Sequence, residues 1–246
     1  MNQNNCLAII LAAGKGTRMD SDIPKVLHTV KKQAMIDYVL DTAFMFNPKK
    51  IFPIVGFKKV EVINHINDSG YLNEKILEYV EQKEQLGTGH AVLQLESKLG
   101  NEEGHLLVLS GDVPNIQYQS LLPIVNNHIE NNIDATIITA TVEDPKGYGR
   151  ILRYESGELI KMVEHKDCNN EEKLIKEINS GIYIFKISQL FKNLKKISSN
   201  NSSNEYYLTD VIELINKNGI VFTKKIDNYE EVMGINNIEQ LESFQK

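Results

Sequence analysis

The residues with the clearest chemical potential lie in a glycine-rich turn near the start of the chain. Residues 11–19 read Leu-Ala-Ala-Gly-Lys-Gly-Thr-Arg-Met, and Pro24 and Lys25 follow. Glycines let the backbone approach a phosphate closely, and the N–H groups of such a turn can bind an anion. Lys15, Arg18 and Lys25 add three positive charges. The turn is therefore a candidate polyphosphate site, the alternative being a surface loop with solvated cations.

Two common phosphate-binding motifs do not describe this turn. It lacks the GxxxxGK(S/T) order of the P-loop, and Met19 stands where the dinucleotide fingerprint has its third glycine. The six histidines are scattered without an HExxH motif, and we interpret them as structural or surface residues. Cys6 and Cys168 form no metal-binding or redox motif, which favours a reducing cytoplasm.

Composition narrows the class of partner. The 246 residues are 41% hydrophobic and carry a net charge of −6, as in an ordinary globular protein. This charge argues against non-specific binding of nucleic acids or membrane surfaces. The first apolar run, residues 6–13, is too short to span a bilayer, and no basic segment precedes it. We expect a cytoplasmic protein with small-molecule substrates, and neither nucleic acid nor membrane as a partner.

Strands and helices alternate through the first part of the chain. Hydrophobic runs predict strands at residues 7–12, 51–55, 76–80, 106–109 and 135–142. Apolar residues at helical spacing predict helices at residues 34–46, 59–67, 89–99 and 121–131. This order predicts an α/β fold with a mostly parallel, Rossmann-like sheet and helices on both faces. Ligands of such sheets bind beyond the carboxyl ends of the strands, where the glycine-rich turn lies.

The pattern becomes richer in strands after residue 144. We predict a hairpin of strands at 150–154 and 159–163, further strands at 178–185 and 220–226, and helices at 190–197, 208–217 and 238–244. The polar run 198–204 is predicted to be a mobile loop. We expect one domain over residues 1–246: a nucleotide-binding half (about 1–144), a small β-rich substrate lobe (about 145–235) and the start of a C-terminal helix (about 236–246). No hexapeptide repeat of the β-helix kind is present.

Eight ordered motifs resemble one known family. The turn with Pro24-Lys25 is similar to the signature of sugar-nucleotide pyrophosphorylases of the nucleotidyltransferase A-like fold. Seven later motifs narrow the resemblance to the uridylyltransferase domain of the bacterial bifunctional N-acetylglucosamine-1-phosphate uridylyltransferase/glucosamine-1-phosphate acetyltransferases. They are Gln85-Leu86-Gly87-Thr88-Gly89-His90, Gly111-Asp112-Val113-Pro114, Gly147-Tyr148-Gly149-Arg150, Val163-Glu164-His165-Lys166, Glu177-Ile178-Asn179-Ser180-Gly181, Glu205-Tyr206-Tyr207-Leu208-Thr209-Asp210 and Gly234-Ile235-Asn236-Asn237.

The resemblance implies a role for each matching residue. Catalysis is assigned to Arg18, Lys25 and Asp112, and Mg²⁺ binding to Asp112 and Asn236, although Asn236 could instead cap the last helix. The sugar-binding positions are Gly149, Glu164, Asn179 and Asn236. The nucleotide-binding positions are Leu11, Ala12, Ala13, Gly14, Lys15, Gln82, Gly87, Thr88, Ser110 and Gly111. Gln82, Gly87 and Thr88 match the uracil-reading segment, and Gln82 taken alone could be a surface residue. Residues 205–210 are expected to close the site structurally.

One position departs from the family pattern. Where the family usually has a tyrosine before Gly-Asp, this chain has Ser110. Backbone contacts to the ligand would survive this change, whereas packing of an aromatic side chain would not. We therefore expect the change to affect nucleotide affinity more than metal binding.

The implied reaction transfers UMP from UTP to N-acetylglucosamine 1-phosphate, with Mg²⁺ as cofactor, and supplies cell-wall (peptidoglycan) and lipopolysaccharide synthesis. A sugar 1-phosphate carries close to two negative charges at neutral pH and needs no general base to attack. The alternatives are a sibling enzyme for glucose 1-phosphate or another nucleotide, a non-catalytic nucleotide-sugar sensor, and a partner-binding subunit. Intact Lys25, Asp112 and Asn236 argue against the sensor. Without the β-helix acetyltransferase domain, we expect no acetyl transfer and a monomer or weak dimer.

Overall fold

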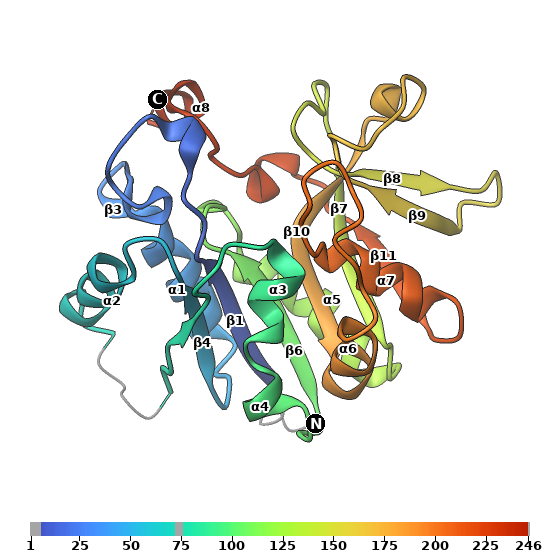
Figure 1. Cartoon of the computed structure of the whole chain (residues 1–246), viewed down its shortest axis with the longest axis horizontal. Coiled ribbons are helices and arrows are strands. Elements are labelled where there is room, and N and C mark those ends of the chain that lie inside the picture. Colours follow the sequence, from blue (N-terminus) through green and yellow to red (C-terminus); the bar gives the residue numbers. More distant parts are fainter. Residues whose placement is uncertain (1–5, 72–75, 246) are drawn as a thin grey trace.

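A buried parallel strand begins the fold and becomes the centre of its sheet. The computed structural model describes residues 6–71 and 76–245, and Figure 1 shows their arrangement. Strand β1 (Cys6–Ala12) lies parallel to β4 (Ile51–Val55) on one side and to β6 (His105–Ser110) on the other. Its side chains point alternately to the two faces of the sheet, and both faces are covered. This double burial explains why the strand is a continuous apolar run.

The main sheet contains both parallel and antiparallel strands. Strand β10 (Glu177–Lys186) runs antiparallel between β6 and β7 (Ala135–Thr141). Strand β11 (Val221–Lys225) is parallel to β7 at one edge, and β5 (Val80–Glu81) forms the other edge. The strand order is therefore β11-β7-β10-β6-β1-β4-β5. The predicted strand at 76–80 was too long, because residues before Val80 contribute only an isolated bridge between Leu77 and Ile51.

A β-hairpin projects from the main sheet on the right of Figure 1. Strands β8 (Arg150–Arg153) and β9 (Leu159–Val163) pair antiparallel, as the sequence predicts, and β8 meets β10 at Ile178. A second, smaller hairpin of β2 (Thr29–Val30) and β3 (Gln33–Ala34) was not predicted, because two-residue strands leave no periodic pattern. The run 198–204 contains neither helix nor strand, and its mobility stays a prediction.

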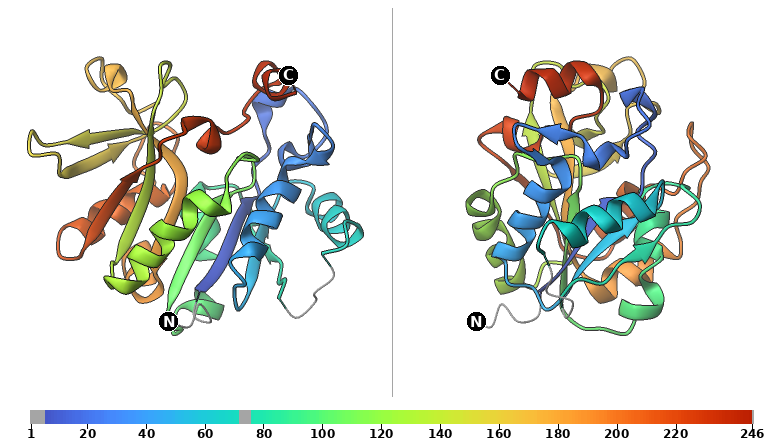
Figure 2. Two further views of the ribbon diagram at one scale, coloured as in Figure 1. Left: turned by 180° about the vertical axis from the view of Figure 1, so that it is seen from behind. Right: turned by 90° about the vertical axis from the view of Figure 1, so that its left-hand side faces the viewer.

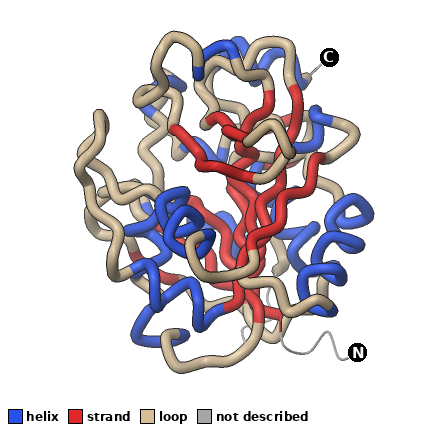
Figure 3. Tube along the Cα trace, turned by 90° about the vertical axis from the view of Figure 1, so that its right-hand side faces the viewer, coloured by secondary structure: helices blue, strands red, loops and turns tan. Residues whose placement is uncertain are grey.

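Helices cover both faces of the sheet, which confirms the predicted layers (Figures 2 and 3). One face carries α1 (Met35–Met45), α2 (Lys59–Asp68) and α5 (Tyr118–Glu130). The other carries α3 (Thr88–Leu93), α4 (Glu96–Leu99), α6 (Ile187–Leu194) and α7 (Leu208–Asn216). The single helix predicted at 89–99 is thus two short helices. Helix α8 (Ile238–Phe244) ends the described chain.

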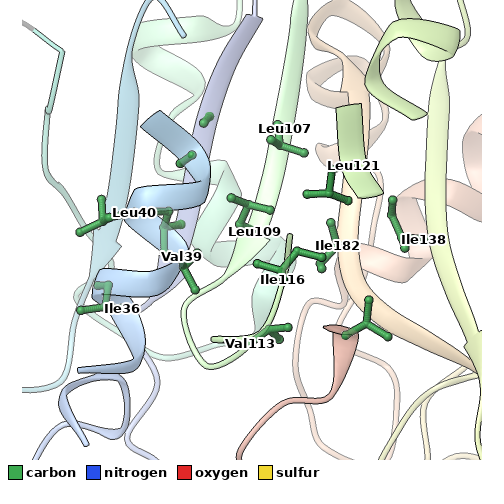
Figure 4. Packing of buried hydrophobic residues seen from close by; sticks show 14 of the residues in the cluster. Ile36, Val39, Leu40, Leu107, Leu109, Val113, Ile116, Leu121, Ile138 and Ile182 are labelled. Atoms are coloured by element: carbon green, nitrogen blue, oxygen red, sulfur yellow. The ribbon is translucent and has the colours of Figure 1, made fainter. Parts of the chain in front are cut away.

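The hydrophobic core on the α1–α5 face holds the strand ends in place. Figure 4 shows Val39 and Leu40 of α1 and Leu121 of α5 packing towards Leu107 and Leu109 of β6. All five of these side chains are fully buried. Burial of a leucine or valine side chain contributes about 1.5–3 kcal/mol. This packing makes β6 a rigid support for the polar residues that follow it. None of the helices in the described chain is long and apolar enough to span a membrane.

Candidate functional site

Two connected cavities lie beyond the carboxyl ends of the parallel strands. The turn cavity, of about 560 Å³, is lined mainly by residues 11–17 together with Lys25, Gln82, Gly87 and Thr88. The lobe cavity, of about 260 Å³, is lined by residues 147–149 and Glu164, which flank the β8–β9 hairpin, by residues of β10, and by Asn236. The two cavities share four of their lining residues, which are Leu11, Thr88, Ser110 and Asp112. A ligand with two parts can therefore occupy both cavities at once.

The glycine-rich turn is held in shape by close packing around two of its residues. Gly16 adopts φ +62°, and a Cβ there would lie 2.6 Å from Cβ of Lys25. Met19 is fully buried beneath the turn, which explains why a large apolar residue replaces a glycine at this position. Gly14 and Lys15 are exposed at the cavity. The turn thus presents backbone and cations to the cavity while its base is anchored.

Charged and amide side chains from distant parts of the sequence meet at the edge of the two cavities. The Lys25 ammonium contacts a carboxylate oxygen of Asp112 and donates to Oδ1 of Asn236 at 2.8 Å. Arg18 donates from Nη2 to the same Oδ1 at 2.9 Å. The backbone N–H of Ile235 donates to the carbonyl of Asp112 at 2.9 Å, which ties the two loops together. Lys25 and Asn236 are 211 residues apart in the sequence, so only the tertiary fold brings them into contact.

The oxygen atoms of Asp112 and Asn236 converge on a positive charge, here that of Lys25. One carboxylate and one amide oxygen are suitable ligands for Mg²⁺, which keeps waters and phosphate oxygens as further ligands. In residues 6–71 and 76–245, no group of three or more His, Cys, Asp or Glu side chains is placed to bind a metal. The helix-cap alternative for Asn236 is wrong, because Asn237 caps α8 by accepting from the N–H of Gln240 at 2.8 Å.

Gln82 lies directly after β5 and is only 3% exposed, so it is not a surface residue. Its amide nitrogen donates to the carbonyl of Gly87 at 3.0 Å. Gly87 adopts φ +105° and ψ 173°, a conformation that is essentially restricted to glycine. Thr88 then begins α3, and its Oγ1 accepts from the N–H of Leu208 at 3.1 Å. The three residues expected to contact the base therefore form one connected wall of the turn cavity.

Residues 205–208, which we call the closing segment, pack against this wall. The N–H of Tyr206 donates to the carbonyl of Leu86 at 2.8 Å, and the N–H of Gly89 donates to the carbonyl of Tyr206 at 2.8 Å. The side chain of Glu205 lines the turn cavity. The sequence motif led us to expect residues 205–210 to close the site, but it assigned no ligand contact to Glu205.

Gly149, Glu164 and Asn179 come together in the lobe cavity. A Cβ on Gly149 would lie 3.4 Å from Oε2 of Glu164 and 3.5 Å from Cβ of Asn179. Burial raises the pKa of the Glu164 carboxyl. Its Oε1 accepts a hydrogen bond from Oγ1 of Thr209 at 3.3 Å. A side chain at position 149 would narrow the cavity, so glycine leaves room there for a ligand.

Asn179 is held by its neighbours. Its amide nitrogen donates to the hydroxyl of Tyr183 at 2.6 Å, and its Oδ1 accepts from the N–H of Gly181 at 3.2 Å. Burial raises the pKa of Tyr183, so its hydroxyl stays protonated at neutral pH. The side chain of Asn179 therefore has a fixed orientation in the wall of the lobe cavity.

Ser110 lies at the junction of the two cavities. Its hydroxyl donates to the carbonyl of Gly181 at 3.2 Å. A Cβ on Gly181 would lie 3.0 Å from Oγ of Ser110, so these two small residues pack closely. The N–H of Gly111 donates to the carbonyl of Leu11 at 3.0 Å, which joins this strand end to the glycine-rich turn.

Tyr148 is a residue at this site that was not singled out from the sequence. Its hydroxyl accepts from the N–H of Gly234 at 3.1 Å, and it lines the lobe cavity. Burial raises the pKa of Tyr148 to about 12. The contact joins the lobe to the loop that carries Asn236. Its position between two glycines in the Gly147–Arg150 motif was the available signal.

Comparisons with known proteins give the family. The nucleotidyl transferase family profile matches residues 7–229. The chain is 45% identical over 237 residues to the bifunctional protein GlmU of Clostridium botulinum (strain Kyoto / Type A2), covering 96% of the chain and 50% of that protein. It is 45% identical over 230 residues to a GlmU of Streptococcus pyogenes serotype M12 (strain MGAS2096), covering 93% and 54%. The chain thus spans about half the length of these curated relatives.

A solved structure gives the same fold at lower sequence identity. A UDP-glucose pyrophosphorylase complexed with UDP-glucose has a TM-score of 0.77 at 22% identity, covering 97% of this chain and 96% of that chain. The α/β nucleotidyltransferase-like fold predicted from the sequence is therefore confirmed, as is the resemblance carried by the ordered motifs. The chain belongs to the nucleotidyl transferase family.

Proposed function

We propose that the chain transfers the uridylyl group of UTP to N-acetylglucosamine 1-phosphate, giving UDP-N-acetylglucosamine and pyrophosphate. The observation that carries this proposal is that the two cavities meet at Asp112. The glycine-rich turn with its cations lines one cavity, and Gly149 lines the other. The similarity to bifunctional GlmU proteins over nearly the whole chain supports the choice of nucleotide and sugar.

The turn cavity would hold UTP. The backbone of residues 11–14 would line the uridine and phosphate pocket, and Ser110 and Gly111 would complete it. Gln82, Gly87 and Thr88 would contact the uracil. Lys15, Arg18 and Lys25 would neutralise the phosphate groups, because three cations at one turn compensate most of the charge of a triphosphate.

The lobe cavity would hold the sugar. Glu164 has an oxygen, Oε2, that faces Gly149 rather than Thr209 and is available to a sugar hydroxyl. Asn179 would line the other side of the ring, and Gly149 leaves space for a substituent. Asn236, at the edge of this cavity, would contact the sugar phosphate.

The chemical step needs positioning and charge stabilisation. An oxygen of the sugar phosphate attacks the α-phosphorus of UTP in line, the bond from that phosphorus to the β-phosphate oxygen breaks, and pyrophosphate leaves. Lys25 and Arg18 would stabilise the charge that develops on the phosphate oxygens. Asp112 and Asn236 would hold Mg²⁺, which supplies further charge neutralisation when bound. Lys25, which contacts both of these oxygens here, would then contact the phosphates instead.

The test is pyrophosphate release by the purified chain with UTP, a panel of sugar 1-phosphates, and Mg²⁺ or a chelator. We expect turnover only with Mg²⁺ and fastest turnover with N-acetylglucosamine 1-phosphate. Turnover with glucose 1-phosphate or another nucleotide at higher kcat/KM would favour a sibling enzyme. Nucleotide binding without release of pyrophosphate would favour a sensor. Cytoplasmic location and a monomeric or weakly dimeric state stay predictions.

A further inference from the structure

The side chain of Gln82 has one orientation fixed by its surroundings. Its amide nitrogen lies 3.0 Å from the carbonyl oxygen of Gly87 and 3.1 Å from Nδ1 of His90. A backbone carbonyl only accepts hydrogen bonds, so the nitrogen and not the oxygen must face Gly87. Within the described chain, the amide oxygen of Gln82 accepts no hydrogen bond. This oxygen is not completely buried, and Gln82 lines the turn cavity. That oxygen is therefore the atom available to a ligand.

His90 provides the second contact that fixes this amide. It lies on α3, one turn after Gly87, and does not itself line the turn cavity. Because the Gln82 nitrogen donates to Nδ1, this atom must be the unprotonated nitrogen of the ring, and the ring proton is on Nε2. The amide nitrogen of Gln94 also lies 3.1 Å from Nε2, but its hydrogen bond is the one that it donates to the backbone carbonyl of His90, at 2.9 Å.

We propose that His90 is a positioning residue that holds Gln82 so that its amide oxygen faces the nucleotide base. An acceptor at this position pairs with the N3–H donor of uracil or thymine. The N3 of cytosine is itself an acceptor, so it would face the Gln82 oxygen with two lone pairs opposed. His90 thereby acts through Gln82 to select a base with a protonated ring nitrogen. This inference rests on the proposed function only in assigning the turn cavity to the nucleotide.

The size of the effect follows from the number of contacts. If Gln82 turned over, its oxygen would face two acceptors, the Gly87 carbonyl and Nδ1 of His90. Removing His90 leaves the Gly87 contact in place, so the preference should weaken without disappearing. Loss of one hydrogen bond of ordinary strength corresponds to about a fivefold to tenfold decrease in the ratio of kcat/KM for UTP to that for CTP.

The experiment compares two substitutions at one position. His90→Leu removes the ring nitrogen, whereas His90→Asn places an amide oxygen close to where Nδ1 lies and keeps an acceptor. A matched control is His65→Leu, because His65 also contacts a side chain through its ring, at 2.9 Å from Asp37, but outside both cavities. For each protein, kcat and KM are measured with UTP and with CTP, and binding of each nucleotide is measured by calorimetry without sugar phosphate.

We expect His90→Leu to lower the UTP-to-CTP ratio about fivefold to tenfold through a higher KM for UTP, with kcat and the KM for the sugar phosphate little changed. His90→Asn should restore most of the ratio, and His65→Leu should leave it unchanged. An unchanged ratio in His90→Leu, or a loss in His90→Asn as large as in His90→Leu, would overturn the inference. So would a wild-type protein that binds UTP no better than CTP.

The binding measurement separates this inference from the proposed function. If the wild-type protein prefers UTP in calorimetry but releases no pyrophosphate with any sugar phosphate, the proposed reaction fails and the role of His90 is still decided by the binding ratios. If His90→Leu does not fold, His90→Asn alone decides, because it must keep the wild-type preference.

Discussion

Replacing one of the two hydrogens on the Cα of Gly87 by a methyl group should disturb the turn cavity and the closing segment together. A Cβ at this position would lie 2.6 Å from the carbonyl oxygen of Tyr206 and 2.9 Å from its backbone nitrogen. These are backbone atoms that cannot rotate away. In the variant Gly87→Ala, the closing segment must therefore move away from the wall formed by Gln82, Gly87 and Thr88.

The cost has two parts. An alanine at φ +105° and ψ 173° is strained by about 1–3 kcal/mol. Displacement of Tyr206 also breaks its two backbone hydrogen bonds, with Leu86 and Gly89, each 2.8 Å long and each contributing about 0.5–1.5 kcal/mol. The free energy of unfolding should therefore fall by about 2–6 kcal/mol in total.

Gly157 offers a matched control. It has φ +90°, in the turn of the β8–β9 hairpin, and a Cβ there would meet nothing within 4 Å. Gly157→Ala should cost backbone strain alone, about 1–2 kcal/mol. Both variants are compared with the wild-type protein by urea denaturation, and UTP affinity is measured by calorimetry. Gly87→Ala should be less stable than Gly157→Ala by at least about 1 kcal/mol and should bind UTP more weakly. Equal stability of the two variants, or unchanged UTP affinity in Gly87→Ala, would refute this reasoning.

Three further predictions concern single residues. His128 is buried, with its ring 4.9 Å from that of His105, and burial lowers its pKa from 6.5 to about 3. Because the unfolded chain binds this proton more strongly, stability should decrease by about 2 kcal/mol between pH 7.5 and pH 5, and His128→Gln should flatten that decrease in urea denaturation. Asp112→Asn should lower kcat at least about 100-fold without a large change in thermal stability, while Asp68→Asn, on the exposed end of α2, should keep full turnover. The wild-type kcat/KM should favour N-acetylglucosamine 1-phosphate over glucose 1-phosphate at least about tenfold. Asn179→Ala should reduce this preference more than it weakens UTP binding. Equal kcat/KM values for the two sugar phosphates in the wild-type protein would contradict the prediction.

The sequence was most informative where side-chain burial is periodic. Strand β9 and helix α8 have the predicted bounds. Strand β1 begins one residue earlier than predicted, and α1 is one residue shorter than predicted at each end. The antiparallel direction of β10 could not be predicted, because a strand buried on both faces has the same pattern in either direction. The split between α3 and α4 was missed for a similar reason, since Ala91, Leu95 and Leu99 continue one apolar stripe through both.

The sequence predicted which residues belong to the candidate site better than it predicted the contacts between them. Ordered motifs selected Lys25, Asp112 and Asn236, but their direct contact depends on loops folding together from both ends of the chain. The role of Asn237 as the cap of α8 was equally hidden, because two adjacent asparagines are indistinguishable as cap candidates in a sequence. His90 lies within one of the ordered motifs, but the sequence suggests no role for it, and only its contact with the Gln82 side chain in the folded protein does.

The most direct test of the central claim follows the phosphorus atoms of UTP. The purified chain is incubated with N-acetylglucosamine 1-phosphate, Mg²⁺ and UTP labelled with ³²P on either the α- or the γ-phosphate, and the products are separated by chromatography. Attack on the α-phosphorus predicts that the α-label appears in UDP-N-acetylglucosamine and the γ-label in pyrophosphate, in equal amounts. Release of either label as orthophosphate, or its recovery in unreacted UTP alone, would contradict the proposed transfer.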